Sequence, residues 1–400
     1  MKYKLKDLIQ PISNKFNFAG KSNVIFLNTS DIYDGHISGT KIKPQNLPGQ
    51  AKKSLKNGDI LFSEIRPKNK RFAIVKNIKA EDYVVSTKLM VLRNCNSNIL
   101  DTRYFYFYLT SPIMIRYLQS EAESRSGTFP QITFKDTMAN IEINLPSLFE
   151  QKLVVKRIET ISSEIYINNQ INDNLLELAK AKFAQTYELP TNEFQKIPNG
   201  WECSKLDKII TFSNGHNFKS NDMLKVPEPL TYKIFKQGNI SIGGGLNDLG
   251  TKNWIQKNKV KNLDKYVLKK WDLLMAMTDM KNKVAILGNT ALMNRDNQYI
   301  LNQRVGLIRS NNYNNTSPCY LFLLTNSKPF LHRIRLKAHS GVQVNLSSKD
   351  IKNMNILIAP KEVNNNFNIF VKPFFEKIME NQVENLTLRE IKQILLNKIF

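Results

Sequence analysis

The chain contains the same sequence frame twice, and this long repeat constrains its fold more than any other feature. Residues 58–75 read GDILFSEIRPKNKRFAIV, and residues 271–287 read WDLLMAMTDMKNKVAIL. Two further echoes follow in the same order: SGTFPQITFKD at 126–136 with SGVQVNLSSKD at 340–350, and NQI at 169–171 with NQV at 381–383. The spacing between the copies is nearly constant and far exceeds the roughly 20–50 residues of a solenoid unit. The sequence therefore predicts two copies of one domain-sized module.

The charge balance is strongly basic. Lys and Arg total 58 against 34 Asp and Glu, a formal net charge of +24. Such an excess favours a polyanionic partner, because each neutralised phosphate releases condensed counterions. AT-rich coding would also enrich Lys, Asn and Ile, but it does not explain the low acidic content. We expect a nucleic acid partner rather than a membrane, since no basic amphipathic anchor is present.

Several features favour a cytoplasmic protein. No run approaches 18 uninterrupted apolar residues, so no transmembrane helix is expected. The N-terminal MKYKLKDLIQP has no apolar core and no cleavage signature, so secretion is not expected. Cys95, Cys203 and Cys319 are widely separated and fit neither a disulfide framework nor a zinc site.

The modules have the composition of α/β (α+β) domains with mixed sheets. The first module, residues 1–146, begins with short strand-like runs at 24–27, 59–62, 71–75, 83–85 and 88–92. A helix pair over 101–123, broken near Ser111-Pro112, precedes a loop and a strand that ends at Ile143. A linker at 189–200 leads to the second module, 201–360, with strands expected at 232–235, 273–277, 284–287 and 305–308 and a helix at 319–324.

Each module is followed by a long helical segment, residues 147–188 and 361–400. The first contains no Gly or Pro, whereas Pro373 in the second should kink the helix or mark its start. The expected helix-packing and partner-docking positions recur mostly at steps of three and four: Val154, Ile158, Ile161, Ile165, Leu175, Leu178, Val371, Phe374, Ile378, Leu388, Ile391 and Leu395. Asn168 and Asn172 interrupt the first stripe, either to fix register against a partner helix or as an exposed part of the seam.

A helix of about 35 residues spans roughly 50 Å and needs a partner for its single apolar stripe. The other copy is the obvious partner. Antiparallel packing would form a coiled-coil spacer and relate the two modules by a pseudo-two-fold axis. The spacer could then hold two DNA readers about one to one-and-a-half helical turns apart.

Two loop sets carry the donors and acceptors that DNA readout needs. Arg suits guanine, Asn and Gln suit adenine, and Lys more often holds phosphate. The first set comprises Arg66, Lys68, Asn69, Lys70, Arg71, Arg125, Ser126, Thr128 and Gln131. The second comprises Thr278, Lys281, Asn282, Lys283, His339, Gln343 and Asn345, and further candidates are Arg333, Arg335 and Lys219. The alternative for each set is an ordinary solvated hairpin.

The chain resembles, over essentially its whole length, the specificity subunit of type I restriction–modification enzymes, which has two target recognition domains. The residues that carry the resemblance are IPNGWE at 197–202, GDILF at 58–62 with Ala73-Ile74, and Leu145-Pro146 followed by Glu150-Gln151. The first module lacks the Pro-Asn-Gly-Trp start, and the second helix lacks Glu-Gln. Trp271 also replaces Gly58.

This resemblance implies recognition of a bipartite, asymmetric double-stranded DNA site. It also implies two adenine-N6 methyltransferase subunits that bind S-adenosylmethionine, and motor–nuclease subunits that use ATP and Mg. The chain itself would bind no cofactor and catalyse nothing. The sequence agrees, since it has no Asn/Asp-Pro-Pro-aromatic run, no phosphate-binding loop and no cluster with metal-ligand spacing. Gly243-Gly244-Gly245 is better explained as a flexible turn.

Two other functions remain open on sequence alone. An autonomous DNA- or RNA-binding protein would work without enzyme partners, although few exposed aromatic platforms are evident. A stand-alone nuclease would require carboxylates that are distant in sequence to converge around a metal ion.

Overall fold

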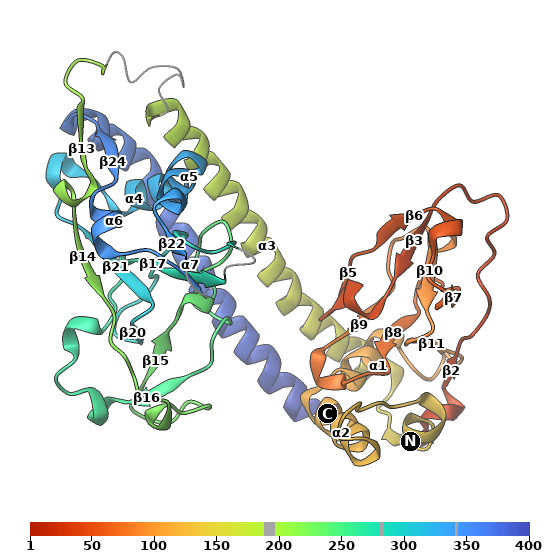
Figure 1. Cartoon of the computed structure of the whole chain (residues 1–400). Coiled ribbons are helices and arrows are strands. Elements are labelled where there is room, and N and C mark those ends of the chain that lie inside the picture. Colours follow the sequence, from red (N-terminus) through yellow and green to blue (C-terminus); the bar gives the residue numbers. More distant parts are fainter. Residues whose placement is uncertain (188–196, 281–283, 341–342) are drawn as a thin grey trace. The chain divides into compact units, whose positions relative to one another are not determined.

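The computed structural model describes residues 1–187, 197–280, 284–340 and 343–400, which form two compact units. Unit 1 comprises Met1–Tyr166 and Leu386–Phe400, and unit 2 comprises Ile167–Asn385. The long helices α3 (Leu148–Tyr187) and α7 (Lys361–Ile399) each contribute residues to both units (Figure 1). Among the described residues, no helix is long and apolar enough to cross a membrane.

Unit 1 is built on two four-stranded sheets. The first, in the order β2-β11-β8-β9, is antiparallel and consists of Ile9–Pro11, Leu89–Asn94, Ile60–Ser63 and Phe72–Ile74. The second, β6-β3-β10-β7, consists of Thr40–Ile42, Val24–Leu27, Tyr83–Ser86 and Ala51–Lys53, with β3 and β10 parallel. Two-stranded pairs complete the unit: β1 (Lys2–Lys4) with β12 (Glu142–Asn144), and β4 (Ile32–Tyr33) with β5 (His36–Ile37).

The predicted helix pair of unit 1 is confirmed as α1 (Thr102–Leu109) and α2 (Pro112–Arg125). The break falls at Ser111, whose hydroxyl accepts a hydrogen bond from the backbone N–H of Met114 and caps α2. After α2, a π-helical turn over Phe134–Met138 precedes β12. The strand that was expected to end at Ile143 is β12, which is three residues long and ends at Asn144.

Unit 2 repeats this plan. Its antiparallel sheet β14-β21-β17-β19 consists of Ile210–Asn214, Val305–Ser310, Leu273–Ala276 and Thr290–Leu292. A second sheet, β16-β15-β20, consists of Trp254–Gln256, Thr231–Phe235 and Tyr299–Leu301, and β13 (Glu202–Lys205) pairs with β24 (Asn355–Ile358). Three shorter helices follow: α4 (Pro318–Asn326), α5 (Lys328–Leu336) and α6 (Ser348–Lys352).

An ion pair on a buried aspartate, at the same place in each unit, supports the duplication. In unit 1, Arg93 donates two hydrogen bonds to Asp59, at 2.7 and 2.8 Å. In unit 2, Arg309 donates two to Asp272, at 2.6 and 2.8 Å. In each unit, the hydrogen bond to the aspartate carboxylate raises the pKa of the arginine. Each pair ties the middle strand of the antiparallel sheet to the start of its neighbour.

The residue before each of these aspartates adopts a left-handed backbone conformation. Gly58 has φ +94° and Trp271 has φ +75°. Their N–H groups donate to the carbonyls of Val75 and Met293, both at 2.9 Å. Trp271 therefore replaces Gly58 in a conformation that disfavours side chains, which keeps the local geometry at a conformational cost.

One predicted strand is wrong. Residues 284–287 form a bend rather than a strand, and β17 pairs instead with β19, so that Leu273 lies opposite Leu292. The bend turns at Gly288, which has φ +79°, and Asp279 accepts hydrogen bonds from the backbone N–H groups of Ile286 and Leu287. The connection between the paired strands is thus longer in unit 2 than in unit 1.

The long helices form where the sequence predicts them. Helix α3 spans Leu148–Tyr187, and α7 begins at Lys361 and continues through Pro373, so Pro373 does not mark its start. Leu178 and Ile391 are 55% and 46% exposed, so these two positions do not pack within the chain, and their expected role in partner docking stays a prediction. In unit 2 the fully or nearly buried positions include Ala179, Phe183, Val371, Phe375 and Met379.

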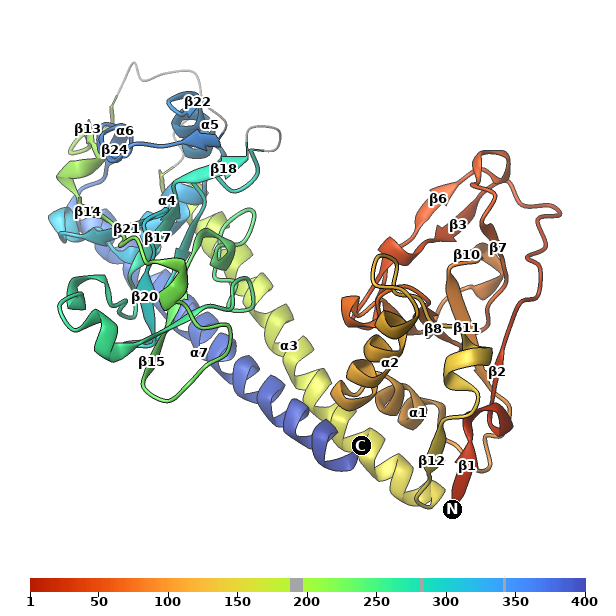
Figure 2. The ribbon, with the colours of Figure 1, turned by 60° about the horizontal axis from the view of Figure 1, so that its bottom comes forward.

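Helices α3 and α7 run side by side within unit 2 (Figure 2), and asparagine side chains join them there by hydrogen bonds. Asn168 donates to the side-chain oxygen of Asn385 at 3.2 Å, and Asn385 donates to Asn169 at 3.0 Å. Asn381 donates to Asn172 at 2.9 Å. These partners run in opposite directions along the two helices. Of the two interpretations of Asn168 and Asn172, the structure supports fixed register in an antiparallel pair.

Candidate DNA interface

In unit 1 the connection between β8 and β9 is held against the loop that follows α2. The backbone N–H of Arg66 donates to the carbonyl of Pro130 at 3.1 Å, and its guanidinium donates to the carbonyl of Thr128 at 3.3 Å. Gln131 donates to the carboxylate of Glu64 at 2.9 Å. The structure therefore brings together the two segments of the first predicted set, 66–71 and 125–131.

Two left-handed residues shape this connection. Arg66 (φ +46°) and Lys70 (φ +55°) flank the 3-10 turn Pro67–Asn69. Only the proline of that turn is buried, so the side chains of Lys68 and Asn69 remain exposed. A conformation that costs non-glycine residues free energy is thus used to present polar and basic side chains outward.

The remaining members of the first set differ in how firmly they are held. Lys68 lies 3.3 Å from the carboxylate of Glu123, and Lys70 lies 3.3 Å from that of Asp34, in exposed ion pairs that hold the cations only weakly. Arg71 is half-buried and donates to the carbonyl of Thr29 at 2.7 Å. Arg125 is exposed and donates to the carbonyl of Asp136 at 3.0 Å. Lys68 and Lys70 are therefore the more available for an anionic partner.

In unit 2 the corresponding segments form a small sheet in the order β18-β23-β22, from Thr278–Met280, Gln343–Asn345 and His339–Ser340. Thr278 pairs with Asn345 and Met280 pairs with Gln343. The Thr278 hydroxyl donates to the side-chain oxygen of Gln237. The structure thus unites Thr278, His339, Gln343 and Asn345, whereas Lys281, Asn282 and Lys283 lie outside the described residues.

His339 contacts an acidic residue at the start of α6. Its imidazole Nε2 lies 3.1 Å from the carboxylate of Asp350. Hydrogen bonding to Ser347 lowers the pKa of Asp350, and the contact with His339 lowers it further. Asp350 therefore stays ionised at neutral pH and restrains the imidazole.

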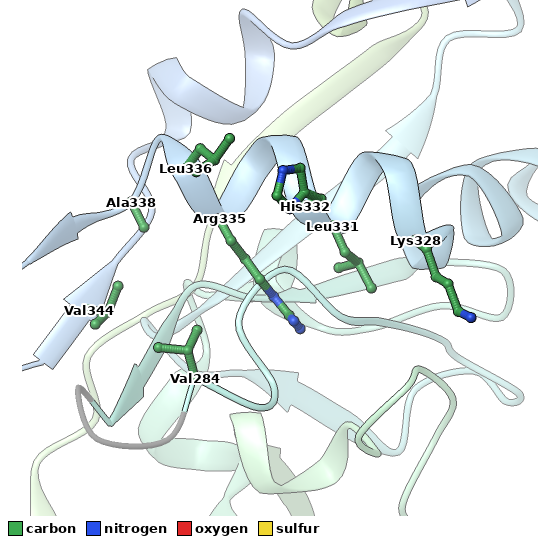
Figure 3. A pocket seen from close by; sticks show the side chains of 8 residues that line it. All are labelled: Val284, Lys328, Leu331, His332, Arg335, Leu336, Ala338 and Val344. Carbon is green, nitrogen blue, oxygen red and sulfur yellow. The ribbon is translucent and has the colours of Figure 1, made fainter. Parts of the chain in front are cut away.

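Arg335 holds the bend that follows β18. Its guanidinium donates to the carbonyls of Leu287 and Ala285, at 3.0 and 3.2 Å. Figure 3 shows its side chain reaching from α5 along an open cavity of about 440 Å³. The cavity is lined by Val284, Lys328, Leu331, His332, Arg335, Leu336, Ala338 and Val344. None of these described lining residues is acidic.

Two other predicted residues lie apart from these loops. The guanidinium of Arg333 donates to the carbonyl of Asn355 at 3.0 Å, next to the end of α5. Lys219 is exposed and precedes the short turn Ser220–Asp222. The structure shows no hydrogen bond from either side chain, within the described ranges, to a member of the second set.

Three residues at these loops were absent from the sequence prediction. Gln237 and Asp279 position β18 and the bend after it, and Phe129 lies exposed between Thr128 and Pro130. Gln237 could not be found, because its partner is far along the chain. Phe129 lies within the SGTFPQI echo, but apolar side chains usually indicate core.

The described residues contain no group of three or more His, Cys, Asp or Glu side chains placed to hold a metal ion. The glycine run 243–245 is an ordered turn, in which the N–H of Gly245 donates to the carbonyl of Thr290 at 2.9 Å and the N–H of Gly244 donates to that of Ser241 at 3.0 Å. The expected flexible turn is therefore a turn that is fastened to β19.

Comparisons with known proteins give one consistent assignment. A family model described as the type I restriction modification DNA specificity domain matches residues 1–177 and again 198–388. The chain is 28% identical to the type I restriction enzyme HindI specificity subunit of Haemophilus influenzae, over 99% of this chain and 98% of that protein. It is 24% identical to the MjaIX specificity subunit of Methanocaldococcus jannaschii, over 74% of this chain and 68% of that protein.

A solved structure shares the fold. The crystal structure of the specificity subunit of a type I restriction–modification system from M. genitalium matches with a TM-score of 0.55 and 12% identity, over 100% of this chain and 96% of that one. The resemblance found in the sequence is thereby confirmed. The chain belongs to the type I restriction–modification DNA specificity family, the non-catalytic DNA-recognition component of these systems, and it carries the specificity domain twice.

Proposed function

We propose that this chain directs a type I restriction–modification complex to a bipartite, asymmetric site in double-stranded DNA, with one half read by each module. The observation that carries the proposal is the equivalent placement of two loop pairs that differ in their side chains. In unit 1, segment 66–71 is fastened to 125–131, and in unit 2 β18 is paired with β23. Because the two modules share the backbone arrangement of these loops but differ in side chains, each module is expected to recognise a different half-site.

The domain boundaries proposed from the sequence assign each DNA-recognition domain to one continuous segment of the chain. Residues 1–146 form the first target recognition domain and 201–360 the second, with residues 189–200 as linker. Helical segments 147–188 and 361–400 join the domains as a spacer. The hydrogen-bonded asparagines of α3 and α7 support such a spacer, because buried polar pairs favour one register over its neighbours.

The candidate side chains in each loop pair divide by chemistry. Arg66 and Arg125 in unit 1 and Gln343 and Asn345 in unit 2 have the donor or acceptor pairs that recognise base edges. Lys68 and Lys70, together with Lys219 outside the loop pairs, suit phosphates, which position a protein without specifying sequence. With a net charge of +24, binding should weaken steeply as salt rises.

The long helices are the proposed docking sites for two adenine-N6 methyltransferase subunits. Ile167, Ile171 and Leu178 of α3 are 49%, 36% and 55% exposed, and their spacing places them near one face of the helix. Leu178 thus fits a docking role rather than packing within the chain. The methyltransferase subunits would supply S-adenosylmethionine for methylation. Motor–nuclease subunits would join the complex and supply ATP with Mg for cleavage, in the cytoplasm where the DNA lies.

Purification with the methyltransferase subunits from the same system tests this proposal. The complex should bind one two-part sequence from a random DNA pool and methylate adenine in both parts. A complex that prefers no two-part sequence would contradict it. The alternative, an autonomous nucleic-acid-binding protein, predicts tight binding by the chain alone, to single strands as well as duplex, and no stable complex.

A module exchange tests which part of the chain reads which part of the site. Residues 201–360 are replaced by the corresponding module of a relative with a different target. One half of the recognition sequence should change and the other should stay. A change in both halves would contradict separate readers, and the unexchanged chain serves as the control.

A further inference from the structure

The duplicated fold places an exposed phenylalanine in unit 1 at the same position as a glutamine in unit 2. Residues 126–132 read SGTFPQI and residues 340–346 read SGVQVNL, so Phe129 corresponds to Gln343. The structure supports this register in two ways. In unit 1, Gln131 forms an antiparallel β-bridge with Ile65. In unit 2, Asn345 forms the equivalent antiparallel pair with Thr278. The next residues, Ile132 and Leu346, are both buried in a core.

Phe129 is held in place although its side chain is open to solvent. Its backbone N–H donates to the hydroxyl of Ser126 at 3.0 Å, and its two neighbours accept hydrogen bonds from Arg66. The side chain is 51% exposed, and in the described part of the chain its ring stacks on no other aromatic ring. Phe129 is therefore an ordered apolar group that the fold leaves uncovered.

Exposure alone is weak evidence for a binding role, since isolated apolar side chains are common on protein surfaces. The residues around Phe129 are stronger evidence. Phe129 lies in the loop that holds the exposed Arg66 and follows the exposed Arg125, which are among the proposed DNA contacts. At the same position the other unit has a glutamine, a residue that recognises base edges by hydrogen bonding.

We infer that Phe129 reads DNA by apolar contact with the C5-methyl group of a thymine, whereas Gln343 reads its half-site by hydrogen bonds. The inference rests on the proposed function and adds a chemical difference between the two readers. A thymine methyl is the apolar feature that the major groove offers, and phenylalanine is among the side chains that contact it. Adenine, with its paired donor and acceptor, is the base that glutamine matches best.

The experiment uses the complex of the full chain with its methyltransferase subunits and a target already mapped for the wild type. A wild-type complex that has no two-part target would refute the proposed function and end the experiment there. With a target in hand, each thymine in the half-site of unit 1 is replaced by deoxyuracil, which lacks only the methyl group. Binding is measured for each duplex.

One deoxyuracil position should weaken wild-type binding about fourfold, the effect of exposing one buried methyl group. The Phe129→Ala complex should bind the thymine duplex more weakly and should not distinguish it from that deoxyuracil duplex. Phe129→Leu should keep part of the discrimination. Phe18→Ala, which changes a phenylalanine of unit 1 that is 36% exposed, should keep all of it.

Three results would overturn the inference while leaving the proposed function intact. The half-site of unit 1 contains no thymine on either strand, wild-type binding ignores every deoxyuracil, or Phe129→Ala retains the full discrimination. A thermal unfolding profile like that of the wild type shows that each variant is folded. In the half-site of unit 2, Gln343→Ala should weaken selection of one base pair without making binding sensitive to deoxyuracil.

Discussion

Replacement of Arg309 by methionine should destabilise unit 2 by about 2–3 kcal/mol, because it leaves the buried carboxylate of Asp272 without its cation, while the 40% exposure of Arg309 keeps the cost below that of a fully buried ion pair. The side chain of Asp272 is 5% exposed and receives two hydrogen bonds from Arg309. In the variant, its described partner would be the backbone N–H of Lys269, at 2.8 Å. Methionine keeps an unbranched side chain at the site, so the loss reflects the charge and its hydrogen bonds.

Urea unfolding followed by tryptophan fluorescence measures this effect selectively, because all three tryptophans, at 201, 254 and 271, lie in unit 2. With a slope of about 2–3 kcal/mol per molar urea, the midpoint should fall by about 1 M. Arg333→Met is the matched control, since Arg333 donates one hydrogen bond to a carbonyl. It should shift the midpoint by less than about 0.5 M.

A double variant separates the cost of the unpaired carboxylate from the value of the pair. Arg309→Met with Asp272→Asn removes the buried charge and should recover a large part of the lost stability. The reasoning would be refuted if Arg309→Met behaved like the Arg333 control. It would also be refuted if the double variant were no more stable than Arg309→Met alone.

Three further changes test other parts of the fold. Gly58→Ala should destabilise unit 1 by about 1 kcal/mol, measured by hydrogen exchange, through the φ of +94° alone, since a Cβ there meets no atom within 4 Å. Asn168→Leu should cost about 1–3 kcal/mol in urea unfolding by leaving Asn385 without its donor, and adding Asn385→Leu should restore much of it. Asp101→Ala should cost about 1–2 kcal/mol at pH 7, because Asp101 caps α1. Burial alone would raise the pKa of Asp101, but hydrogen bonds from Arg103 and the backbone outweigh it and lower the pKa. That stabilisation is present above about pH 4 and is lost as pH falls further, so thermal unfolding of wild type and variant should converge in acid.

The sequence predicts the long helices well and their packing less well. Leu148–Tyr187 contains no residue that breaks a helix, so its bounds could be read directly. Leu178 and Ile391 follow the predicted spacing but are exposed, because steps of three and four cannot locate a narrow seam along so long a helix. Asn168 could be either exposed or paired until its partner Asn385 was located in space.

The sequence also predicted the candidate interface only in part. The echo at 126–136 and 340–350 located both loops, since the same frame recurs in each module. The repeat at 281–286 led to the wrong strand, because Ala285 and Ile286 match Ala73 and Ile74 of β9 in sequence. In the structure, β19 pairs with β17 in the place that β9 has beside β8. Arg335 looked available for DNA, but two backbone carbonyls occupy its guanidinium. Spacing along a chain does not reveal such long-range hydrogen bonds.

The central claim is that two readers on one chain specify two different halves of one DNA site. Mapping of methylated adenines in DNA from cells that express this chain with its methyltransferase subunits tests it most directly. We expect one asymmetric motif in two parts, separated by bases of no fixed identity, with methylation in both parts that is lost when this chain is deleted. A continuous motif, a symmetric one, or methylation that persists without this chain would contradict it.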